Sequence, residues 1–337
     1  KMFKYRCKVC NYFFDELKEN IAFEKLPQSW KCPVCNASKD MFIEIKEKDI
    51  KNKNVDFDKN NKIVENDMTD EDSFKTAPDL MIEQMAAWGI KYVFGIPGTS
   101  SLGVVESVRK NKDIEYFQVR HEQTAAMMAS AYGKLTGNIA ACLTIAGPGA
   151  TNLATGLYDA TLDKSPVLVI TGHVQRKLIG TKAFQEINQH EFFETFAVFN
   201  KTINHSDEVT RLTTLAIRHA LIEKGVSHLS ISVDIQKEKC DDDIIPIEGK
   251  IATISATATE NIIDQAVSMI NNSKRPVIVA GAGALENKED IKELSQKISA
   301  PIVTSFRGKG IVDDDYFLHV GGHGGIGSLT AGKLTDS

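Results

Sequence analysis

The sequence predicts an α/β protein with several domains, and three observations lead to this prediction. Four cysteines occur as two C-x-x-C pairs within the first 35 residues. From Thr76 onward, short apolar runs alternate with amphipathic segments of helical length. A second stretch of the same alternation begins near Ala258. Because strands that alternate with helices form a parallel sheet, we expect a small metal module, a doubly wound parallel-sheet domain and a further α/β domain.

The two cysteine pairs indicate a metal site. A stretch of 21 residues separates the pairs Cys7/Cys10 and Cys32/Cys35. Two such pairs that fold together form a tetrahedral thiolate cage for one metal ion. Zinc ribbons use a similar spacing, so the spacing alone leaves zinc open. A disulfide framework is disfavoured, because six cysteines in 337 residues are few and no secretory signal is present.

Residues 1–46 resemble rubredoxin, the small one-iron electron carrier. The resemblance rests on Pro33 in the second cysteine pair and on aromatic residues at the positions of the small rubredoxin core, namely Tyr5, Tyr12, Phe23, Trp30 and Phe42. Asn11 and Asn36 stand where rubredoxins usually have glycine, and the loop between the pairs is several residues shorter than usual. The resemblance implies an iron site, with zinc as the alternative, formed by Cys7, Cys10, Cys32 and Cys35.

Composition excludes several classes of partner. The net charge of −5 and the lack of a basic stripe give no nucleic-acid footprint. No apolar run approaches the roughly 20 residues that span a bilayer, so we expect a cytoplasmic protein. The chain starts with Lys1 and lacks an initiator methionine, which we interpret as a fragment of a longer protein. Residues 47–75 are rich in Lys, Asp, Asn and Glu, which predicts a solvated linker.

The region 76–245 supplies the elements of the predicted doubly wound sheet. A Gly-Pro turn at 147–152 leads into a helix whose start carries free N–H groups. The continuous apolar run at 166–171 predicts a strand buried on both faces. The remaining elements that we expect, in chain order, are a helix at 77–88, a strand at 92–95, a helix at 102–110, a strand at 115–118, a helix at 123–135 and a strand at 140–145.

Four motifs in this region resemble the N-terminal pyrimidine-binding domain of thiamine diphosphate enzymes. They are GIPG at 95–98, RHEQTAAMMASAYGKLTG at 120–137, GPGATNLATGLYDATLDKSPVLVITG at 147–172 and GTKAFQEI at 180–187. The family members that they resemble most are pyruvate oxidases, quinone-linked pyruvate dehydrogenases and acetolactate synthases. The resemblance implies a 2-oxo acid substrate, with pyruvate expected, and thiamine diphosphate as the cofactor.

The same resemblance implies site residues. Glu122 matches the glutamate that holds the proton shared with N1′ of the cofactor pyrimidine; a capping role at the start of a helix is the alternative. Gln185 and Phe184 match residues of the reaction centre, and core packing is the alternative for Phe184. Residues implied to let the backbone approach the cofactor are Gly95, Pro97, Gly98, Gly147 and Gly149.

Residues 258–337 resemble part of the middle domain of the same family, which carries FAD in the oxidases and in acetolactate synthase. The sequence predicts a helix at 259–271, a strand at 276–280 and a tight G-x-G turn beyond it. A G-x-G turn by itself is weak evidence for a flavin. By resemblance, the residues along FAD would be Gly281, Gly283, Ser305, Phe306 and His323.

The family's third domain holds Mg²⁺ and the diphosphate through a G-D-G…N segment, and the sequence has no such motif. We therefore expect a chain that is truncated before that domain and inactive alone, with the cofactor at a subunit interface of a homo-oligomer. The leading interpretation is an oxidative decarboxylase that passes electrons through FAD to the iron centre or an external acceptor. The alternatives are an acetolactate synthase-type carboligase and a rubredoxin-like electron carrier on a partial scaffold.

Overall fold

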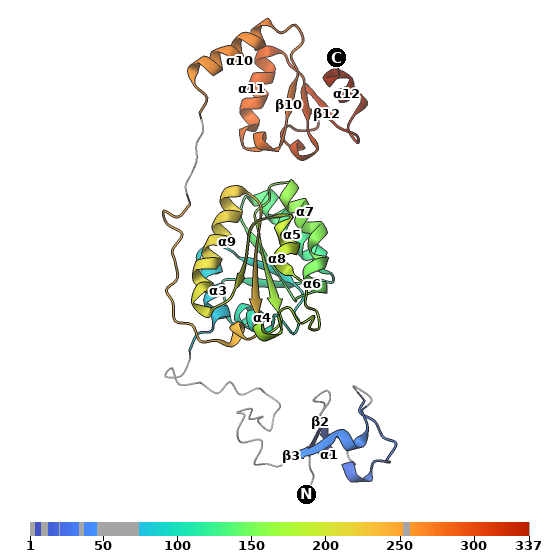
Figure 1. Ribbon diagram of the computed structural model, residues 1–337. Helices are drawn as coiled ribbons and strands as arrows, with labels where there is room; N and C mark the ends of the chain where they lie inside the picture. Colours follow the sequence, from blue (N-terminus) through green and yellow to red (C-terminus); the bar gives the residue numbers. More distant parts are fainter. Residues whose placement is uncertain are drawn as a thin grey trace. The chain divides into compact units, whose positions relative to one another are not determined.

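The computed structural model describes residues 4–7, 13–19, 21–33, 37–45, 74–251 and 257–336. The chain folds into two compact units, residues 1–246 and 247–337. The described residues form three separate sheets (Figure 1). No helix in these ranges is long and apolar enough to cross a bilayer.

The first sheet is small and antiparallel, with strand order β2-β1-β3. Its elements are β1 (Lys4–Cys7), β2 (Phe13–Asp15), α1 (Glu16–Glu19) and β3 (Phe42–Ile45). Aromatic rings form its core: Tyr5 stacks on Phe23 with 4.2 Å between ring centroids, and Trp30 packs edge-on against Phe23 at 5.6 Å. The buried Glu16 carboxylate accepts a 2.8 Å hydrogen bond from the Phe23 amide.

The second sheet has six strands in the order β5-β4-β6-β7-β9-β8, and every pair is parallel. The strands are β4 (Tyr92–Gly95), β5 (Glu115–Gln118), β6 (Ala140–Thr144), β7 (Val167–His173), β8 (Ala197–Ile203) and β9 (Val226–Ser232). Every residue of β6, β7 and β9 is buried, as expected for strands covered on both faces. The predicted α/β architecture with a parallel sheet is confirmed.

Helices cover both faces of this sheet. The helices are α3 (Ala77–Ala87), α4 (Leu102–Lys110), α5 (Glu122–Thr136), α6 (Pro148–Asn152), α7 (Ala154–Leu162), α8 (Gln189–Glu194) and α9 (Val209–Glu223). Figure 1 shows α3 and α9 on one side of the sheet and α5 and α7 on the other. The α5 and α7 backbones approach closely, because a β-carbon placed on Gly156 would lie 2.5 Å from that of Ala126.

The segment after β9 closes this domain against its own first helix. The Ala77 amide donates to the Glu238 carbonyl at 3.1 Å. Near the end of α3, Trp88 Nε1 and Gln84 Nε2 both donate to the Ile245 carbonyl, at 2.7 and 2.9 Å. These bonds tie the start of the domain to residues about 160 positions later in the chain.

Most predicted elements lie within two residues of the observed ones. The helix predicted at 77–88 ends at Ala87, and the strand predicted at 166–171 runs to His173. The elements β8, α9 and β9 were not assigned from sequence. The two strands lack a clear strand pattern in the sequence. The strand β8 lies at the edge of the sheet and is mostly half-buried, and β9 buries serines among its apolar residues.

The third sheet lies within residues 247–337 and consists of three parallel strands in the order β10-β11-β12. Its elements are α10 (Glu260–Asn272), β10 (Ile278–Ala280), α11 (Lys288–Ile298), β11 (Ile302–Thr304), β12 (His319–Gly322) and α12 (Leu329–Thr335). Ala280, Ile302, Ile311 and Val312 form its buried core. The strand predicted at 276–280 is present but shorter than expected, since it begins at Ile278.

The six-stranded sheet contains a topological switch point. The chain leaves β4 for β5 on one side and then crosses to β6 on the other side of β4. Ligands of open parallel sheets bind in the crevice at the carboxyl ends of strands at such a point. The strands meet closely there, since a β-carbon on Gly95 would lie 1.9 Å from the Leu143 carbonyl oxygen of β6.

The contact at Gly95 yields a prediction about stability. Gly95→Ala forces β4 away from β6, so we expect a loss of about 3 kcal/mol in the free energy of unfolding. In Gly89→Ala the added β-carbon meets no atom within 4 Å, but Gly89 has φ 83°. Backbone strain alone should then lower the free energy of unfolding, by about 1 kcal/mol. Denaturant unfolding of both variants tests whether Gly95→Ala loses more stability than Gly89→Ala. An equal loss of unfolding free energy in the two variants would contradict the packing argument.

Candidate functional site

Glu122 is a buried carboxylate at the carboxyl edge of the six-stranded sheet. It is the first residue of α5, directly after His121, whose Nδ1 caps the helix by accepting a bond from the Gln123 amide at 3.2 Å. Only 8% of Glu122 is exposed. A carboxylate at this place is favoured by the free N–H groups and the dipole of the helix start. The sequence therefore places an ionisable group inside the protein where ligands of such sheets bind.

Asn152 holds one oxygen of this carboxylate. Its Nδ2 donates to Glu122 Oε2 at 3.0 Å, which joins the end of α6 to the start of α5. In the part of the chain that the structure describes, Glu122 Oε1 has no hydrogen-bond partner. It faces Gly149, where an added β-carbon would lie 3.5 Å from it. One carboxylate oxygen is thus held by Asn152, and the other faces the Gly149 backbone.

The loop after β6 presents bare backbone beside Glu122. Gly147 has φ 62° and ψ −115°, a conformation that suits glycine. At Gly149 an added β-carbon would lie 2.3 Å from Thr144 Oγ1 and 2.7 Å from the Ile145 side chain. Both glycines are therefore required by the local structure. Their contact with a cofactor ring stays a prediction, and the absence of side chains fits the close approach of a flat ring.

The GIPG loop after β4 has a clear packing role. Gly95 contacts the β6 backbone, and an added β-carbon on Gly98 would lie 2.4 Å from the Ile145 side chain. Pro97 between them is exposed. The loop is tied to the one after β6, because the Ala146 amide donates to Ser100 Oγ at 2.9 Å. A cofactor contact of Gly95, Pro97 and Gly98 remains a prediction.

The loop between β7 and α8 brings Gln185 to this site. A β-carbon on Gly147 would lie 2.6 Å from the Gln185 carbonyl oxygen, so the two backbones touch. Gln185 has φ 65°, which is unusual for a residue with a side chain. Phe184 is 87% exposed, so the alternative that it packs in the core is wrong. Its place in a reaction centre stays a prediction.

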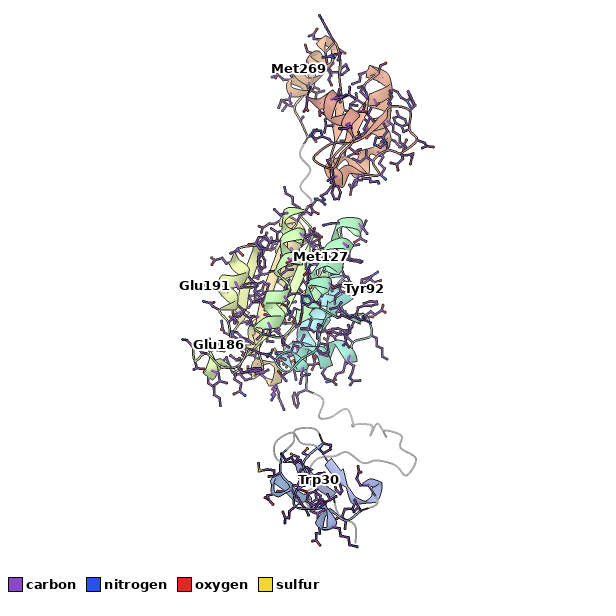
Figure 2. All side chains as sticks on the ribbon, turned by 90° about the vertical axis from the view of Figure 1, so that its right-hand side faces the viewer. Trp30, Tyr92, Met127, Glu186, Glu191 and Met269 are labelled. Carbon is purple, nitrogen blue, oxygen red and sulfur yellow. The ribbon has the colours of Figure 1, made fainter. Side chains whose placement is uncertain are left out.

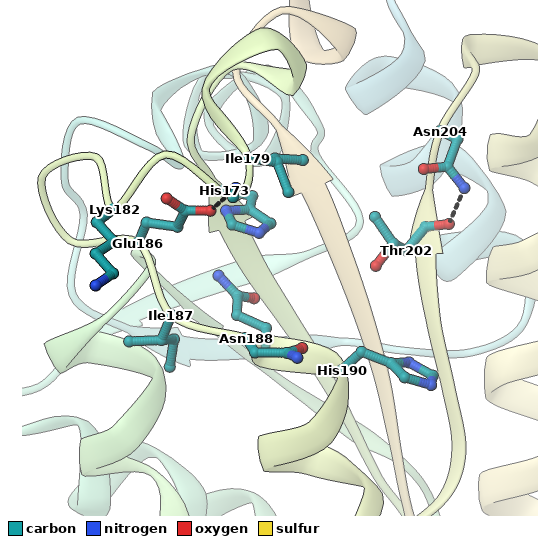
Figure 3. A pocket seen from close by; sticks show the side chains of 11 residues that line it. His173, Ile179, Lys182, Glu186, Ile187, Asn188, His190, Thr202 and Asn204 are labelled. Atoms are coloured by element: carbon teal, nitrogen blue, oxygen red, sulfur yellow. Dashed lines mark hydrogen bonds between the residues drawn. The ribbon is translucent and has the colours of Figure 1, made fainter.

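A cavity of about 500 Å³ lies behind this loop, lined by residues of β7, β8 and the segment 179–190 (Figure 3). His173, Glu186 and His190 are ionisable groups in its wall. Burial lowers the pKa of His173, opposed by the nearby Glu186. His173 Nδ1 accepts the Val174 amide at 2.9 Å, so the neutral ring carries its proton on Nε2. His190, which sequence reasoning left without a role, is exposed at this wall.

The cysteine module is described for one member of each pair. Cys7 and Cys32 are completely buried in the aromatic core of the first sheet. Cys10 and Cys35 lie outside the described residues, as do Asn11, Asn36 and Tyr12. The two described sulfurs are thus enclosed by the protein, as a thiolate cage requires.

The third sheet carries a cavity of about 270 Å³ near the ends of β11 and β12. Ser305, Phe306 and His323 line it together. Their contact with FAD stays a prediction. His319 Nε2 is a buried atom in its wall that has no hydrogen-bond partner among the described residues. This orphaned polar atom fits a cavity that receives a polar ligand.

The two predicted glycines of this domain differ in surroundings. A β-carbon on Gly281 would lie 3.7 Å from Ser305 Oγ, so Gly281 adjoins the cavity. Gly283 has no atom within 4 Å of that position. Its predicted flavin contact remains a prediction.

Sequence reasoning missed Asn152 and Glu186. Asn152 ends the GPGATN motif, and its place in that motif was the only signal for it in the sequence. Glu186 completes the FQE triplet, where only Phe184 and Gln185 drew attention. Cys142 and Cys240 are free thiols, and both are buried.

Three family models match the chain. The rubredoxin model matches residues 4–42. The model described as "Thiamine pyrophosphate enzyme, N-terminal TPP binding domain" matches residues 75–192, and that of the central domain matches residues 263–337. Thiamine pyrophosphate is another name for thiamine diphosphate.

Curated relatives agree with these matches. YdaP of Bacillus subtilis (strain 168), whose name describes it as thiamine pyrophosphate-containing, is 38% identical over 258 residues, covering 76% of this chain and 45% of that protein. Pyruvate oxidase of Lactiplantibacillus plantarum is 33% identical, covering 72% of this chain and 40% of its own. Acetolactate synthase isozyme 1 large subunit of Escherichia coli (strain K12) is 32% identical, over 73% of this chain and 44% of that protein. The chain spans less than half the length of these relatives.

The cysteine module yields a prediction about metal content. Cys7→Ser and Cys32→Ser each remove a thiolate from the proposed cage, so we expect loss of most bound iron and of its visible absorption. Cys142→Ser changes a buried thiol of the other sheet and serves as the control, expected to keep the metal. Elemental analysis identifies the metal, and full metal content in both module variants would contradict the cage.

Proposed function

Because this chain carries a rubredoxin domain and the N-terminal and central domains of a thiamine pyrophosphate enzyme, we propose that it belongs to an oxidative 2-oxo acid decarboxylase. In this proposal, electrons pass via FAD to the iron of the rubredoxin domain or to an external acceptor. Pyruvate is the proposed substrate, and acetate or an acetyl ester the product. The relative named pyruvate oxidase supports that substrate.

The observation that carries the proposal is the arrangement around Glu122. When bound, thiamine pyrophosphate supplies a centre that stabilises a carbanion. Glu122 Oε1 would hold the proton shared with the pyrimidine nitrogen N1′, and Asn152 fixes the other oxygen in place. The helix start holds the charge, and the enclosure of the carboxylate keeps competing water away.

Residues of the neighbouring loops shape the place of the ring. Gly147 and Gly149 would admit the pyrimidine, since neither position has room for a side chain. Gln185, whose backbone contacts Gly147, would face the reacting atoms together with Phe184. The diphosphate and Mg²⁺ would need a domain beyond these three, and a homo-oligomer would place that domain of one subunit against the pyrimidine domain of another.

FAD is proposed for the cavity of the third sheet. Ser305, Phe306 and His323 would hold it, with Gly281 adjoining. The buried Nε2 of His319, which has no partner among the residues that the structure describes, would bond to a polar atom of the ligand. FAD bound there would supply two-electron redox chemistry, and a rubredoxin iron accepts one electron at a time.

A second candidate is a carboligase of the acetolactate synthase type. Relatives of that name, at 29 to 33% identity, include one as similar to this chain as the pyruvate oxidase is, at 33%. A third, from a different class, is an electron carrier in which the thiamine-enzyme domains serve as a docking platform. Incubation with pyruvate separates the first two: acetate with a reduced acceptor supports the oxidase, and acetolactate without reduction supports the carboligase.

Glu122→Gln tests whether the chain is catalytic at all. In the complete enzyme that contains this chain, the amide cannot exchange the pyrimidine proton, so we expect turnover to fall at least about 100-fold. The metal spectrum should stay unchanged. The exposed Glu115→Gln is the control and should keep full activity. Persistent turnover in Glu122→Gln would overturn the assignment of the catalytic carboxylate to Glu122, and with it the mechanism proposed here.

A further inference from the structure

The loop between β7 and α8 has an unusual backbone. Within seven residues, Gly180, Lys182 and Gln185 have positive φ values of 86°, 59° and 65°. A residue with a side chain loses roughly 1 to 2 kcal/mol in this conformation. Two such residues close together need compensating contacts. Phe184 offers none within the described chain, because it is 87% exposed.

The carboxylate of Glu186 supplies these contacts. One oxygen accepts the Gly180 amide and the other accepts the Ala183 amide at 3.0 Å. The Glu186 amide donates back to the Ala183 carbonyl at 2.9 Å. These hydrogen bonds form a closed ring between the Glu186 side chain and the backbone of the turn. Phe184 and Gln185 both lie within that turn.

The charge of Glu186 strengthens this ring. The Gly180 amide lowers the pKa of the carboxyl most; amides of Ala183 and Lys182 and the neighbouring His173 add to the effect, against the cost of desolvation. A carboxylate with a lowered pKa is ionised at neutral pH. Hydrogen bonds from N–H groups to an ionised carboxylate are stronger than neutral ones.

Other residues fix the two ends of the loop and leave its middle to Glu186. At the start, Arg176 donates to Asp234 at 2.8 Å and to the Asn204 carbonyl at 2.9 Å. At the end, the buried Gln189 donates to the Gly172 carbonyl at 2.9 Å. Between these anchors, Thr181 Oγ1 donates to the Leu178 carbonyl at 2.7 Å, and the Glu186 carboxylate holds the turn from Gly180 to Glu186.

The held turn reaches the candidate active site. The Gln185 carbonyl lies against Gly147, whose loop continues to Gly149 beside the Glu122 carboxylate. A shift of the turn would therefore move Gln185 relative to Glu122. Small displacements of this kind cost large factors in rate.

We propose that Glu186 is a positioning residue, which holds Phe184 and Gln185 in place for the reaction without touching the substrate. This inference rests on the proposed function, since it assigns Gln185 to the reaction centre. Its structural half, that the carboxylate orders the turn, does not depend on catalysis. The two halves are tested separately.

Glu186→Gln is the first variant. It keeps the size of the side chain but turns one acceptor oxygen into an NH₂ group, which cannot bond to a backbone N–H. Glu191→Gln is the matched control, because Glu191 is an exposed glutamate five positions on (Figure 2). Glu186→Asp keeps the charge on a shorter arm and should be intermediate.

Amide hydrogen exchange tests the structural half on the chain itself. We expect exchange at 180–186 to speed up about tenfold in Glu186→Gln and to stay unchanged in Glu191→Gln. Exchange in β7 and β9 should remain as in the parent, which shows that the domain is folded. Unchanged exchange at 180–186 in Glu186→Gln would overturn the proposal.

A double-mutant cycle in the complete enzyme tests the positioning half. Glu186→Gln should lower kcat/KM about tenfold or more in the parent, but less than about twofold when Gln185 is already alanine. A merely structural residue would cost the same factor in both backgrounds, and that result would overturn the proposal. Failure of the proposed function has a different signature, namely turnover that survives Glu122→Gln.

Discussion

The close contact between the backbones of β4 and β6 is the constraint on which the candidate site depends. A parallel sheet that switches direction brings the carboxyl ends of these strands together, and the loops beyond them must share the same space. Gly95 meets the Leu143 carbonyl and Gly98 meets the Ile145 side chain. Gly149 packs against Thr144 at the end of β6. The glycines that we propose admit a flat ring beside Glu122 are thus also demanded by the packing of the sheet.

A network of buried, neutral polar groups lies next to the candidate site. His228 stacks on Phe193 with 3.6 Å between ring centroids and lies 2.8 Å from both Thr171 Oγ1 and Asn200 Oδ1. Burial holds the pKa of His228 well below its usual value, so the ring is neutral at physiological pH. Thr171 also bonds to Gln189, the anchor at the end of the β7–α8 loop. The network therefore connects the centre of the sheet to the loop that carries Gln185.

Sequence alone predicted the parts of the fold that local patterns encode. The buried strand β7 shows as an unbroken apolar run, and α5 begins within one residue of the expected place. The strand β9 was not predicted, because its serines and His228 are polar residues and the sequence does not show that the neighbouring strands bury them. Local pattern carries no information about such tertiary burial.

The candidate site likewise contains residues that the sequence identifies and contacts that it does not. Glu122 and the glycines at 147 and 149 stand in motifs, so their residue types and spacing identify them. The bond from Asn152 to Glu122 joins residues 30 positions apart and depends on how α6 meets α5. For Phe184 the sequence left core packing open as the alternative to a reaction-centre role, and only the structure, which leaves the ring exposed, removes that alternative. Contacts made across elements were the part that pattern could not supply.

The rubredoxin domain is the feature that separates the two enzymatic interpretations in physical terms. A carboligase returns the electrons of the decarboxylated substrate to a new carbon–carbon bond, so no electron leaves the enzyme and a one-electron centre has nothing to carry. Oxidation releases two electrons in each turnover, and a one-electron centre must then be reduced twice. Two cysteines buried in a core of stacked aromatic rings are suited to that task, since a low-dielectric enclosure controls solvent access to the metal and its redox potential. The covalent fusion of such a domain to thiamine-enzyme domains is therefore the physical reason for proposing the oxidative reaction first.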